Sequence, residues 1–371
     1  MHILAYTDSA GIGGAEISLG HLVANASADI ALTIVGVHPT VVNAIAQHRP
    51  QSQFYTLPAR GFSALRSHLS LFHRLQPDIV HLNLCTPWAG AIGLFTALSL
   101  PHARVVRVDQ LPLRTTDLLT WLRTRSLCLR VDAHVAVGQA CGRKMEDFYA
   151  LGRQSVQSIP NGVPDIPLSN SAFTPVTPTP QESGFLIGSI GRLDPMKGHD
   201  ILLQAIARVP GTKVMIIGEG AYRETLEKLA IALGISDRIT LPGWIEQPQQ
   251  YLPTFDVVVQ PSRSEGFPLT VVEAMLAACP IIATNVGSVA EAIHPEQTGL
   301  LIQKDNVDEL VAALNLLRDR PTLRHELGQR ARQTALQHFT VDAMVTQYET
   351  LWRSLLTQPR HPRLRVPQPK A

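Results

Sequence analysis

The chain has 371 residues, more than one hydrophobic core normally supports, so we expect two domains. Its composition, with 45% hydrophobic and 17% charged residues, is that of a globular protein with a net charge of +2. Even the charge of +4 carried by residues 1–163 is too small to indicate a nucleic-acid partner. The longest uncharged apolar stretch, Trp88 to Leu100, is shorter than the roughly 20 residues that span a bilayer. Four scattered cysteines without zinc-binding spacing are expected to stay reduced, as in a cytoplasmic protein.

Short apolar runs alternate with helical patterns through the first half, which is typical of a parallel sheet covered by helices. The first run is interrupted by Asp8, so we expect a strand there and not an export signal. Helical spacing is clearest over residues 16–26, 63–75 and 139–151. The expected strands are Ile3–Thr7, Ala31–Val37, Phe54–Leu57, Ile79–Leu84, Val105–Val108, Ala133–Val137 and Val156–Ile159.

A glycine-rich turn, Gly11 to Glu16, follows the first expected strand and opens a helix. Such a turn alone is compatible with a dinucleotide site. That fingerprint, however, needs a third glycine where Glu16 stands, and an acidic residue at the end of the next strand, where residues 35–38 (VGVH) have none. The sequence therefore disfavours an NAD-dependent oxidoreductase.

A proline-rich stretch, residues 164–184, separates the two halves and is expected to be an extended linker. We predict a first domain over residues 1–163 and a second over residues 185–340. A helix over residues 341–356 should pack back on the first domain, and a basic tail over residues 357–371 should be disordered. The strands expected in the second domain are Phe185–Ile190, Val214–Ile217, Ile239–Leu241, Val257–Gln260 and Ile281–Ala283.

The segment SRSEGFPLTVVEAMLAA places two carboxylates, Glu265 and Glu273, around the start of an expected helix. A helix start offers free backbone N–H groups and the positive end of the helix dipole, which suit a diphosphate. Carboxylates beside an anion site are unfavourable unless they bind hydroxyl groups, as on a sugar and a ribose. Upstream, Arg192 can bind phosphate oxygens as a fork and Lys197 can supply a mobile charge.

The motifs Ser-x-x-Glu-Gly-Phe-Pro, Glu-Ala-Met and Pro-Ile-Ile-Ala-Thr, preceded by Gly-Arg-Leu…Lys-Gly, occur here in that order. They resemble the nucleotide-sugar signature of retaining glycosyltransferases of the GT-B fold, glycosyltransferase group 1 (family 4). The resemblance implies an α/β protein with two Rossmann-like doubly wound domains facing across a cleft. It also implies metal-independent, retaining transfer from a UDP- or GDP-linked sugar to a glycan or lipid-linked acceptor, as in cell-surface polysaccharide synthesis. A non-catalytic nucleotide-sugar-binding homologue is the alternative.

The resemblance also implies roles for individual residues. Arg192 and Lys197 hold the diphosphate in place of a metal ion, Glu265 orients the sugar, and Glu273 binds the ribose. The glycine-rich turn brings its backbone to the donor phosphate or to the acceptor. The predicted catalytic residues are Glu265, Arg192, Lys197 and Asp109. The predicted donor-binding residues are Gly13, Gly14, Gly218, Trp244, Gly266, Phe267, Pro268, Leu269 and Glu273. No cofactor and no metal ligand is predicted.

Asp109 is a departure from the family pattern, which usually shows a histidine after the fifth strand of the first domain. Aspartate can accept hydrogen bonds from sugar hydroxyls but cannot donate one while it is ionised. Gly287-Ser288 is a second departure, since two glycines are common there. Trp244 has two interpretations, packing in the core or contact with the base.

An anionic membrane surface, met peripherally from the cytoplasmic side, is a further candidate partner. Residues 1–163 carry 13 Lys and Arg against 9 Asp and Glu, whereas residues 184–356 carry 15 against 19. Within the basic half, residues 114–130 mix leucines and Trp121 with four arginines, which suits a helix lying on an anionic membrane. An ordinary packed helix with a solvated basic face is the alternative, because the apolar positions form no single stripe.

Overall fold

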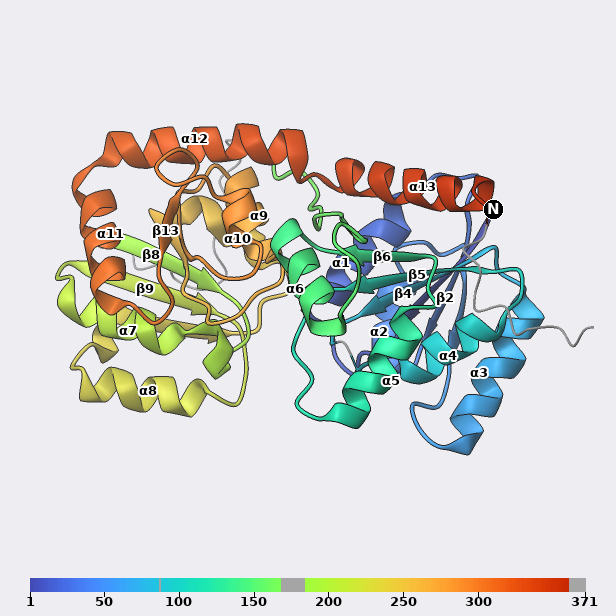
Figure 1. Cartoon of the computed structure of the whole chain (residues 1–371). Helices are drawn as coiled ribbons and strands as arrows, with labels where there is room; N and C mark the ends of the chain where they lie inside the picture. Colours follow the sequence, from blue (N-terminus) through green and yellow to red (C-terminus); the bar gives the residue numbers. More distant parts are fainter. Residues whose placement is uncertain (87, 168–183, 360–371) are drawn as a thin grey trace, which may run out of the picture. The chain divides into compact units, whose positions relative to one another are not determined.

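The computed structural model describes residues 1–86, 88–167 and 184–359 of the chain. They form two units, each with its own sheet and its own core (Figure 1). The first unit is Met1–Gly162 together with the C-terminal segment from Val341, and the second is Val163–Thr340. Most of the predicted linker and most of the predicted tail, residues 168–183 and 360–371, lie outside the described residues.

The sheet of the first unit has seven parallel strands in the order β3-β2-β1-β4-β5-β6-β7. Every strand predicted there is present, and each strand end lies within one residue of its predicted position. The strands are β1 (His2–Thr7), β2 (Ala31–Gly36), β3 (Gln53–Thr56), β4 (Ile79–Leu84), β5 (Arg104–Asp109), β6 (Ala133–Ala136) and β7 (Val156–Ser158). The helices between them are α1 (Gly14–Asn25), α2 (Pro39–Ala46), α3 (Phe62–Leu75), α4 (Ala91–Ser99), α5 (Leu118–Cys128) and α6 (Gln139–Tyr149).

The sheet of the second unit has six parallel strands in the order β10-β9-β8-β11-β12-β13. Its strands are β8 (Phe185–Ile190), β9 (Thr212–Ile217), β10 (Ile239–Gly243), β11 (Val257–Gln260), β12 (Ile281–Thr284) and β13 (Leu300–Ile302). Its helices are α7 (His199–Arg208), α8 (Arg223–Ala232), α9 (Leu269–Leu276), α10 (Val289–Ala292), α11 (Val307–Asp319) and α12 (Pro321–His338), with 3-10 turns η1 (Pro195–Lys197), η2 (Ser236–Arg238) and η3 (Pro248–Thr254). Only β13 was not predicted, because its three residues are too few to show a pattern.

Both sheets are covered by helices, which explains why their central strands are apolar almost throughout. All six residues of β4 are buried, as are all six of β8. A strand covered on one face only would alternate apolar and polar residues instead. The fold is therefore α/β with two doubly wound parallel sheets, as the sequence predicts.

The C-terminal helix α13 (Val341–Thr357) completes the core of the first unit. Trp352 and Tyr348 on this helix are buried, and their rings meet the His81 ring edge-on at centroid distances of 5.6 and 5.2 Å. Burial lowers the pKa of His81 to about 3. His81 is thus a neutral core histidine beneath α13.

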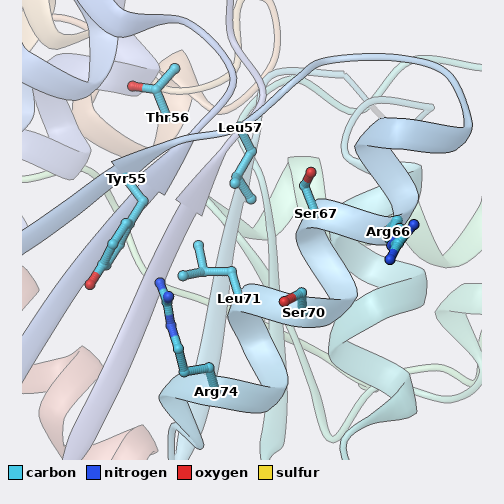
Figure 2. Close-up of a pocket in the computed structure, with 8 residues that line it drawn as sticks. All are labelled: Tyr55, Thr56, Leu57, Arg66, Ser67, Ser70, Leu71 and Arg74. Carbon is cyan, nitrogen blue, oxygen red and sulfur yellow. The ribbon is translucent and has the colours of Figure 1, made fainter.

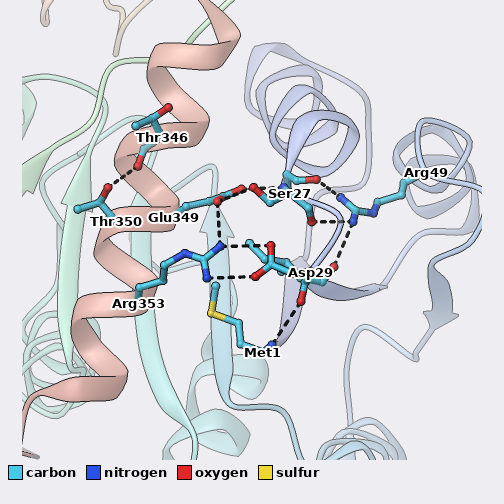
Figure 3. Close-up of polar contacts among 10 residues, drawn as sticks. Met1, Ser27, Asp29, Arg49, Thr346, Glu349, Thr350 and Arg353 are labelled. Atoms are coloured by element: carbon cyan, nitrogen blue, oxygen red, sulfur yellow. Dashed lines mark hydrogen bonds and ion pairs between the residues drawn. The ribbon is translucent and has the colours of Figure 1, made fainter.

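Polar contacts fix α13 to the end of α1 and the loop that follows it (Figure 3). The carboxylate of Glu349 accepts hydrogen bonds from the backbone N–H and the hydroxyl of Ser27, at 2.7 and 2.8 Å. Arg353 pairs with Asp29 at 3.1 Å. On the other side of this loop, Arg49 donates to four backbone carbonyls at the end of α1 and beyond it. The segment after Thr340 is thereby part of the first unit.

Candidate functional site

The donor-site residues predicted in the second unit lie where its sheet changes its winding direction. β8 stands between β9 and β11, and later strands are added outward on both sides. The loops after β8, β9 and β11 carry Arg192, Gly218 and Glu265, respectively. Doubly wound sheets bind ligands outside the carboxyl ends of their strands at such a point. The structure therefore brings these residues to one edge of one sheet.

Two glycines let the loops at this edge pack backbone against backbone. Gly218 has a φ of +147°, and a Cβ there would lie 2.0 Å from the carbonyl oxygen of Gly191. Gly287 has a φ of +58°, and a Cβ there would lie 1.9 Å from the carbonyl oxygen of Glu265. Ser288 has a φ of −104° and donates its N–H to the next carbonyl of the Glu265 loop at 2.9 Å. The second position of the Gly287-Ser288 pair therefore needs no glycine.

Glu265 is anchored through one of its two carboxylate oxygens. Its Oε1 accepts hydrogen bonds from Lys197 Nζ at 2.6 Å, from Gln260 Nε2 at 2.9 Å and from Ser262 Oγ at 2.7 Å. Its Oε2 has no partner in the part of the chain that the structure describes. The first oxygen fixes the carboxylate, and the second can accept a hydrogen bond from a ligand hydroxyl.

Lys197 and Glu265, predicted as separate ligands of diphosphate and sugar, form an ion pair. Their side chains are only 19% and 10% exposed. Such a partly buried, charge-assisted hydrogen bond is stronger than a pair on the surface. An anion that binds beside Lys197 must therefore compete with Glu265 for the ammonium group.

Arg263, which the sequence analysis missed, joins the turn that carries Lys197 to the loop that carries Glu265. Its guanidinium pairs with Asp200 at 2.7 Å and with Asp305 at 2.6 Å. Its backbone N–H also donates to a carbonyl of η1 at 2.7 Å. The sequence signal was its position in the loop between β11 and α9, two residues before Glu265. Its carboxylate partners, however, are distant along the chain. Arg263 therefore helps to position Lys197 and Glu265 by joining the two segments that carry them.

Glu273 lies at the start of the second turn of α9. Its side chain is partly buried, and this burial raises the pKa of its carboxyl to about 7. Among the described residues, none forms an ion pair or hydrogen bond with this carboxyl. At the start of the same helix, the Thr270 hydroxyl donates to the Ile190 carbonyl at the end of β8, at 3.4 Å. Glu273 is thus a partly buried hydrogen-bond acceptor near the carboxyl end of β8.

The loop of residues 266–269 leads into α9 and is buried. The ring of Phe267 is 4% exposed and packs on Phe339 at a centroid distance of 5.2 Å. The Phe267 side chain therefore belongs to the core. The predicted donor-binding loop is Gly266, Phe267, Pro268 and Leu269. Its backbone lies at the start of α9, where free N–H groups favour an anion.

Arg192 and Trp244 are both exposed. The Arg192 side chain is 75% exposed and pairs with Asp194 at 3.1 Å, which is a weak interaction in water. Its guanidinium can therefore turn toward a phosphate at little cost. Trp244, just after β10, is 68% exposed, so the interpretation that it packs in the core is wrong. An exposed indole can stack on a nucleotide base.

Asp109, at the end of β5, is not placed to bind a sugar. It is fully buried, and its two carboxylate oxygens accept hydrogen bonds from Arg107 Nε and Nη2, at 2.8 and 2.9 Å. The Arg107 guanidinium lies over the Tyr149 ring at 5.6 Å and also donates to Cys128 Sγ at 3.0 Å. A buried charge needs such a partner to remain ionised. The prediction that Asp109 is catalytic is corrected: it is half of a structural ion pair.

Glu16 caps the glycine-rich turn of the first unit. Its Oε2 accepts the N–H of Gly13 at 3.0 Å, which closes the first turn of α1. Its Oε1 accepts a hydrogen bond from Cys85 Sγ at 3.0 Å. Burial raises the pKa of the Glu16 carboxyl and that of the Cys85 thiol. The N–H of Gly13 is thus engaged within the turn, whereas Gly14, the first residue of α1, is exposed.

A chain of buried hydrogen bonds behind this turn could not be read from the sequence. Ser18 donates to Asn161 at 2.7 Å, and the Asn161 amide donates to Gln110 at 3.0 Å. Gln110 in turn donates to Asn83 at 2.8 Å, and Asn83 donates to the Ala15 carbonyl at 3.0 Å. Asn161 therefore helps to hold the start of α1 against β4 and β5.

The arginine-rich segment predicted over residues 114–130 contains α5. Leu118, Leu119 and Leu122 are 69%, 79% and 48% exposed, and Arg123 beside them is exposed and has no ion pair with a described residue. Trp121 faces the protein and donates to a backbone carbonyl of α6 at 2.6 Å. We call Leu118, Leu119, Leu122 and Arg123 the α5 surface. It is an apolar, basic face that the first unit leaves uncovered.

Two further properties concern the described residues as a whole. No group of three or more His, Cys, Asp or Glu side chains among them is arranged to hold a metal ion. Of the helices in residues 1–86, 88–167 and 184–359, none is long and apolar enough to cross a membrane.

Two family models match the chain: Glycosyltransferase Family 4 over residues 12–165, and Glycosyl transferases group 1 over residues 175–334. D-inositol 3-phosphate glycosyltransferase of Mycolicibacterium smegmatis is 34% identical over 195 residues, which are 50% of this chain and 44% of that protein. Lipopolysaccharide core biosynthesis glycosyltransferase LpsE of Rhizobium meliloti is 27% identical over 169 residues, which are 46% of this chain and 50% of that protein. The chain spans about half the length of these curated relatives.

Solved structures with the same fold include Anabaena HepE in complex with UDP-glucose, with a TM-score of 0.82 and 19% identity over 95% of this chain and 100% of that chain. Sucrose-phosphate synthase of Thermosynechococcus elongatus has a TM-score of 0.79 and 20% identity over 96% and 99% of the two chains. At such identities the likeness shows the fold, and the family models show the family. The chain belongs to the group 1 glycosyltransferases of family 4, and its fold is GT-B.

Proposed function

We propose that this protein transfers a sugar from a nucleoside-diphosphate sugar to a hydroxyl group of a glycan or lipid-linked acceptor. The observation that carries the proposal is the convergence of Arg192, Lys197, Glu265 and Glu273 at the carboxyl edge of one sheet. The names of similar proteins support it. HepE was crystallised with UDP and with UDP-glucose, and relatives are named for lipopolysaccharide core and O-antigen biosynthesis.

In this proposal the donor lies along the carboxyl ends of β8, β9 and β11. Lys197, Arg192 and the start of α9 bind the diphosphate, because all three favour negative charge. Glu273 accepts hydrogen bonds from the ribose, and Trp244 stacks on a uracil or guanine base. The diphosphate draws Lys197 from its 2.6 Å contact with Glu265, which leaves more of that carboxylate for the sugar hydroxyls.

Transfer breaks the bond between the sugar C1 and a diphosphate oxygen and forms a bond between C1 and the acceptor oxygen on the same face. Because both bonds lie on the same face of C1, the configuration is retained, and the acceptor proton passes to the departing diphosphate, which balances the charge. Arg192, Lys197 and the α9 start stabilise the negative charge that develops on the leaving group. Because these groups neutralise the diphosphate, the proposed reaction needs neither a metal ion nor a cofactor.

The α5 surface extends the proposal to a location, the inner face of an anionic membrane. Exposed leucines beside an exposed arginine favour insertion of apolar side chains at the headgroup level, with the cation against the lipid phosphates. The four cysteines are free, as expected in a reducing compartment. Peripheral docking would bring a lipid-linked acceptor to the first unit.

Non-catalytic binding of a nucleotide sugar is the second candidate, favoured by the burial of Asp109 where the family usually shows a histidine. Titration of the protein with UDP- and GDP-sugars, followed by measurement of diphosphate release with and without acceptor, separates the two. Binding with acceptor-stimulated release supports the transferase. Binding without release supports the second candidate, and failure of every nucleotide sugar to bind contradicts both.

A further inference from the structure

Residues 30–77, which include β3 and α3, contain no aspartate or glutamate. They contain four arginines: Arg49, Arg60, Arg66 and Arg74. The acidic residues next to this stretch are engaged elsewhere, since Asp29 pairs with Arg353 and Asp78 accepts the backbone N–H of His2 at 2.7 Å. This part of the first unit therefore carries positive charge that is not neutralised locally.

A cavity of about 340 Å³ lies between β3 and α3 within this stretch (Figure 2). It is an open groove on the surface of the first unit, since Arg66, Ser70 and Arg74 along it are exposed. The polar residues that line it are Tyr55, Thr56, Arg66, Ser67, Ser70 and Arg74. The lining thus includes two arginines and the serines Ser67 and Ser70, without an acidic side chain, while the Tyr55 hydroxyl already donates to Gln53 at 3.2 Å.

The two arginines of this cavity are not neutralised, and one of them, Arg74, is held in place. Neither Arg66 nor Arg74 forms an ion pair with a residue in the part of the chain that the structure describes. The Arg74 guanidinium lies over the Tyr55 ring at 5.6 Å, a contact that orients the cation and keeps its charge. Arg66, Ser70 and Arg74 follow each other at four-residue spacing, so they share one face of α3. The two cations are about 12 Å apart along the helix, at roughly 1.5 Å per residue.

We propose that this cavity binds an anionic sugar of the acceptor. Guanidinium groups bind carboxylates and phosphates through paired, charge-assisted hydrogen bonds, so Arg74, which the Tyr55 ring orients, would hold the acidic group, and Arg66 would add positive charge farther along the groove. The hydroxyls of Ser67 and Ser70 can both donate and accept, which matches the hydroxyl groups of the sugar ring. That the ligand belongs to the acceptor rests on the proposed function, whereas the binding of an anionic sugar does not.

Calorimetric titration of the whole chain with four probes tests the ligand class: glucuronate, glucose 6-phosphate, inorganic phosphate and glucose. We expect both anionic sugars to bind at least about tenfold more tightly than glucose, because the neutral sugar lacks the charge-assisted bonds. The tighter of the two identifies the acidic group as carboxylate or phosphate. Inorganic phosphate should bind more weakly than glucose 6-phosphate. Equal affinity of glucose and the anionic sugars, or of phosphate and glucose 6-phosphate, overturns the proposal.

Variants locate the site. Arg74→Gln should raise the Kd of the tighter anionic sugar about tenfold, and Arg66→Gln should raise it less, because its charge lies farther from the acidic group. Arg143→Gln is the matched control, since Arg143 is exposed on α6, which packs beside β7 at the opposite edge of the sheet from β3. An equal loss in the Arg143 variant, or no loss in either cavity variant, overturns the site.

UDP and GDP binding, measured on the same preparations, keeps this test separate from that of the proposed function. Arg66→Gln and Arg74→Gln should leave nucleotide binding unchanged. If the wild-type chain binds anionic sugars but no nucleotide, the proposed function fails and the cavity stands. If it binds a nucleotide but does not distinguish glucuronate and glucose 6-phosphate from glucose, the cavity proposal fails alone.

Discussion

The two units differ in how they use their arginines. In the second unit most guanidinium groups pair with carboxylates, as Arg208 does with Asp308 and Arg324 with Asp256. In the first unit several exposed arginines form no ion pair with any residue that the structure describes: Arg60, Arg66, Arg74, Arg114, Arg123 and Arg130. The second unit neutralises most of its guanidinium groups with its own carboxylates, whereas the first leaves several exposed guanidinium groups without a carboxylate partner among the described residues.

Removal of the charged side chains at the carboxyl edge of the second sheet should have the largest effect on activity. Lys197→Ala and Glu273→Ala should each lower the rate of transfer about a hundredfold, because a well-placed charged contact to a transition state is worth on the order of 3 kcal/mol. Neither side chain is a core apolar group, so the variants should fold. Steady-state kinetics with the donor found by titration, alongside circular dichroism, gives the result.

Lys228→Ala is the control for the lysine variant. Lys228 pairs with Glu224 at 2.6 Å on α8, but both side chains are more than 70% exposed, so their pair is worth little. Its kcat/KM should match that of the wild-type chain. If Lys197→Ala or Glu273→Ala has a wild-type rate, that residue has no role in transfer. If Lys228→Ala loses as much activity as Lys197→Ala, the loss is not specific to the proposed site.

The strands and the second-unit motifs were predictable because they depend on local patterns. Apolar runs bounded by turns located the strands, and the motifs from Arg192 to Glu273 indicated that these residues lie at one edge of the second sheet. The error at Asp109 came from ignoring Arg107: residues two apart on a strand point to the same side, so the pair was visible in the sequence. Arg263 was missed for another reason, since only the folded chain brings it to Asp200 and Asp305.

Stability should depend on pH through Glu273. Its folded-state pKa of about 7 lies above the ordinary value of 4.5, so the folded state binds the proton more tightly than the unfolded state does. The protonated carboxyl of Glu273 therefore adds to the free energy of unfolding. This stabilisation is fully present below pH 4.5 and is lost as the pH rises through 7. At roughly 1.4 kcal/mol per unit, the loss is about 3 kcal/mol at most. Glu273→Gln should therefore be more stable than the wild type at pH 8 while transferring poorly.

The comparison of variant with wild type isolates this effect. Burial lowers the pKa of His134 and of His199 to about 4, so these groups act with the opposite sign and destabilise the fold as the pH falls below about 6.5. They are present in both proteins and cancel in the difference. Urea unfolding between pH 5 and 8, with Glu246→Gln at an exposed position as control, supplies the data. A constant difference between Glu273→Gln and the wild type would refute the assignment.

The uncompensated charge of the first unit should be visible in membrane binding. We expect flotation with anionic vesicles, a loss of flotation at high salt, and at least about thirtyfold weaker partitioning of the Arg123→Glu/Arg130→Glu variant, since each cation near the surface contributes about 1 kcal/mol. Arg125 is left unchanged because it stacks on Trp121 at 5.7 Å. Arg143→Glu/Lys144→Glu makes the same charge change on α6 and should float normally. Equal recovery with neutral and anionic vesicles would contradict docking.

Chelation should have the smallest effect. Dialysis against EDTA is expected to leave the rate within about twofold, because Arg192, Lys197 and the α9 start already meet the charge of the diphosphate. The sharper form of the test adds Mg²⁺ to the Lys197→Ala variant. Partial rescue there, without stimulation of the wild type, would mean that the lysine occupies the electrostatic role that a metal ion can fill. A wild-type rate that falls on chelation and returns with Mg²⁺ or Mn²⁺ would contradict metal-independent transfer. It would mean that the second unit, whose cations are mostly paired with its own carboxylates, has too little free positive charge to bind the diphosphate.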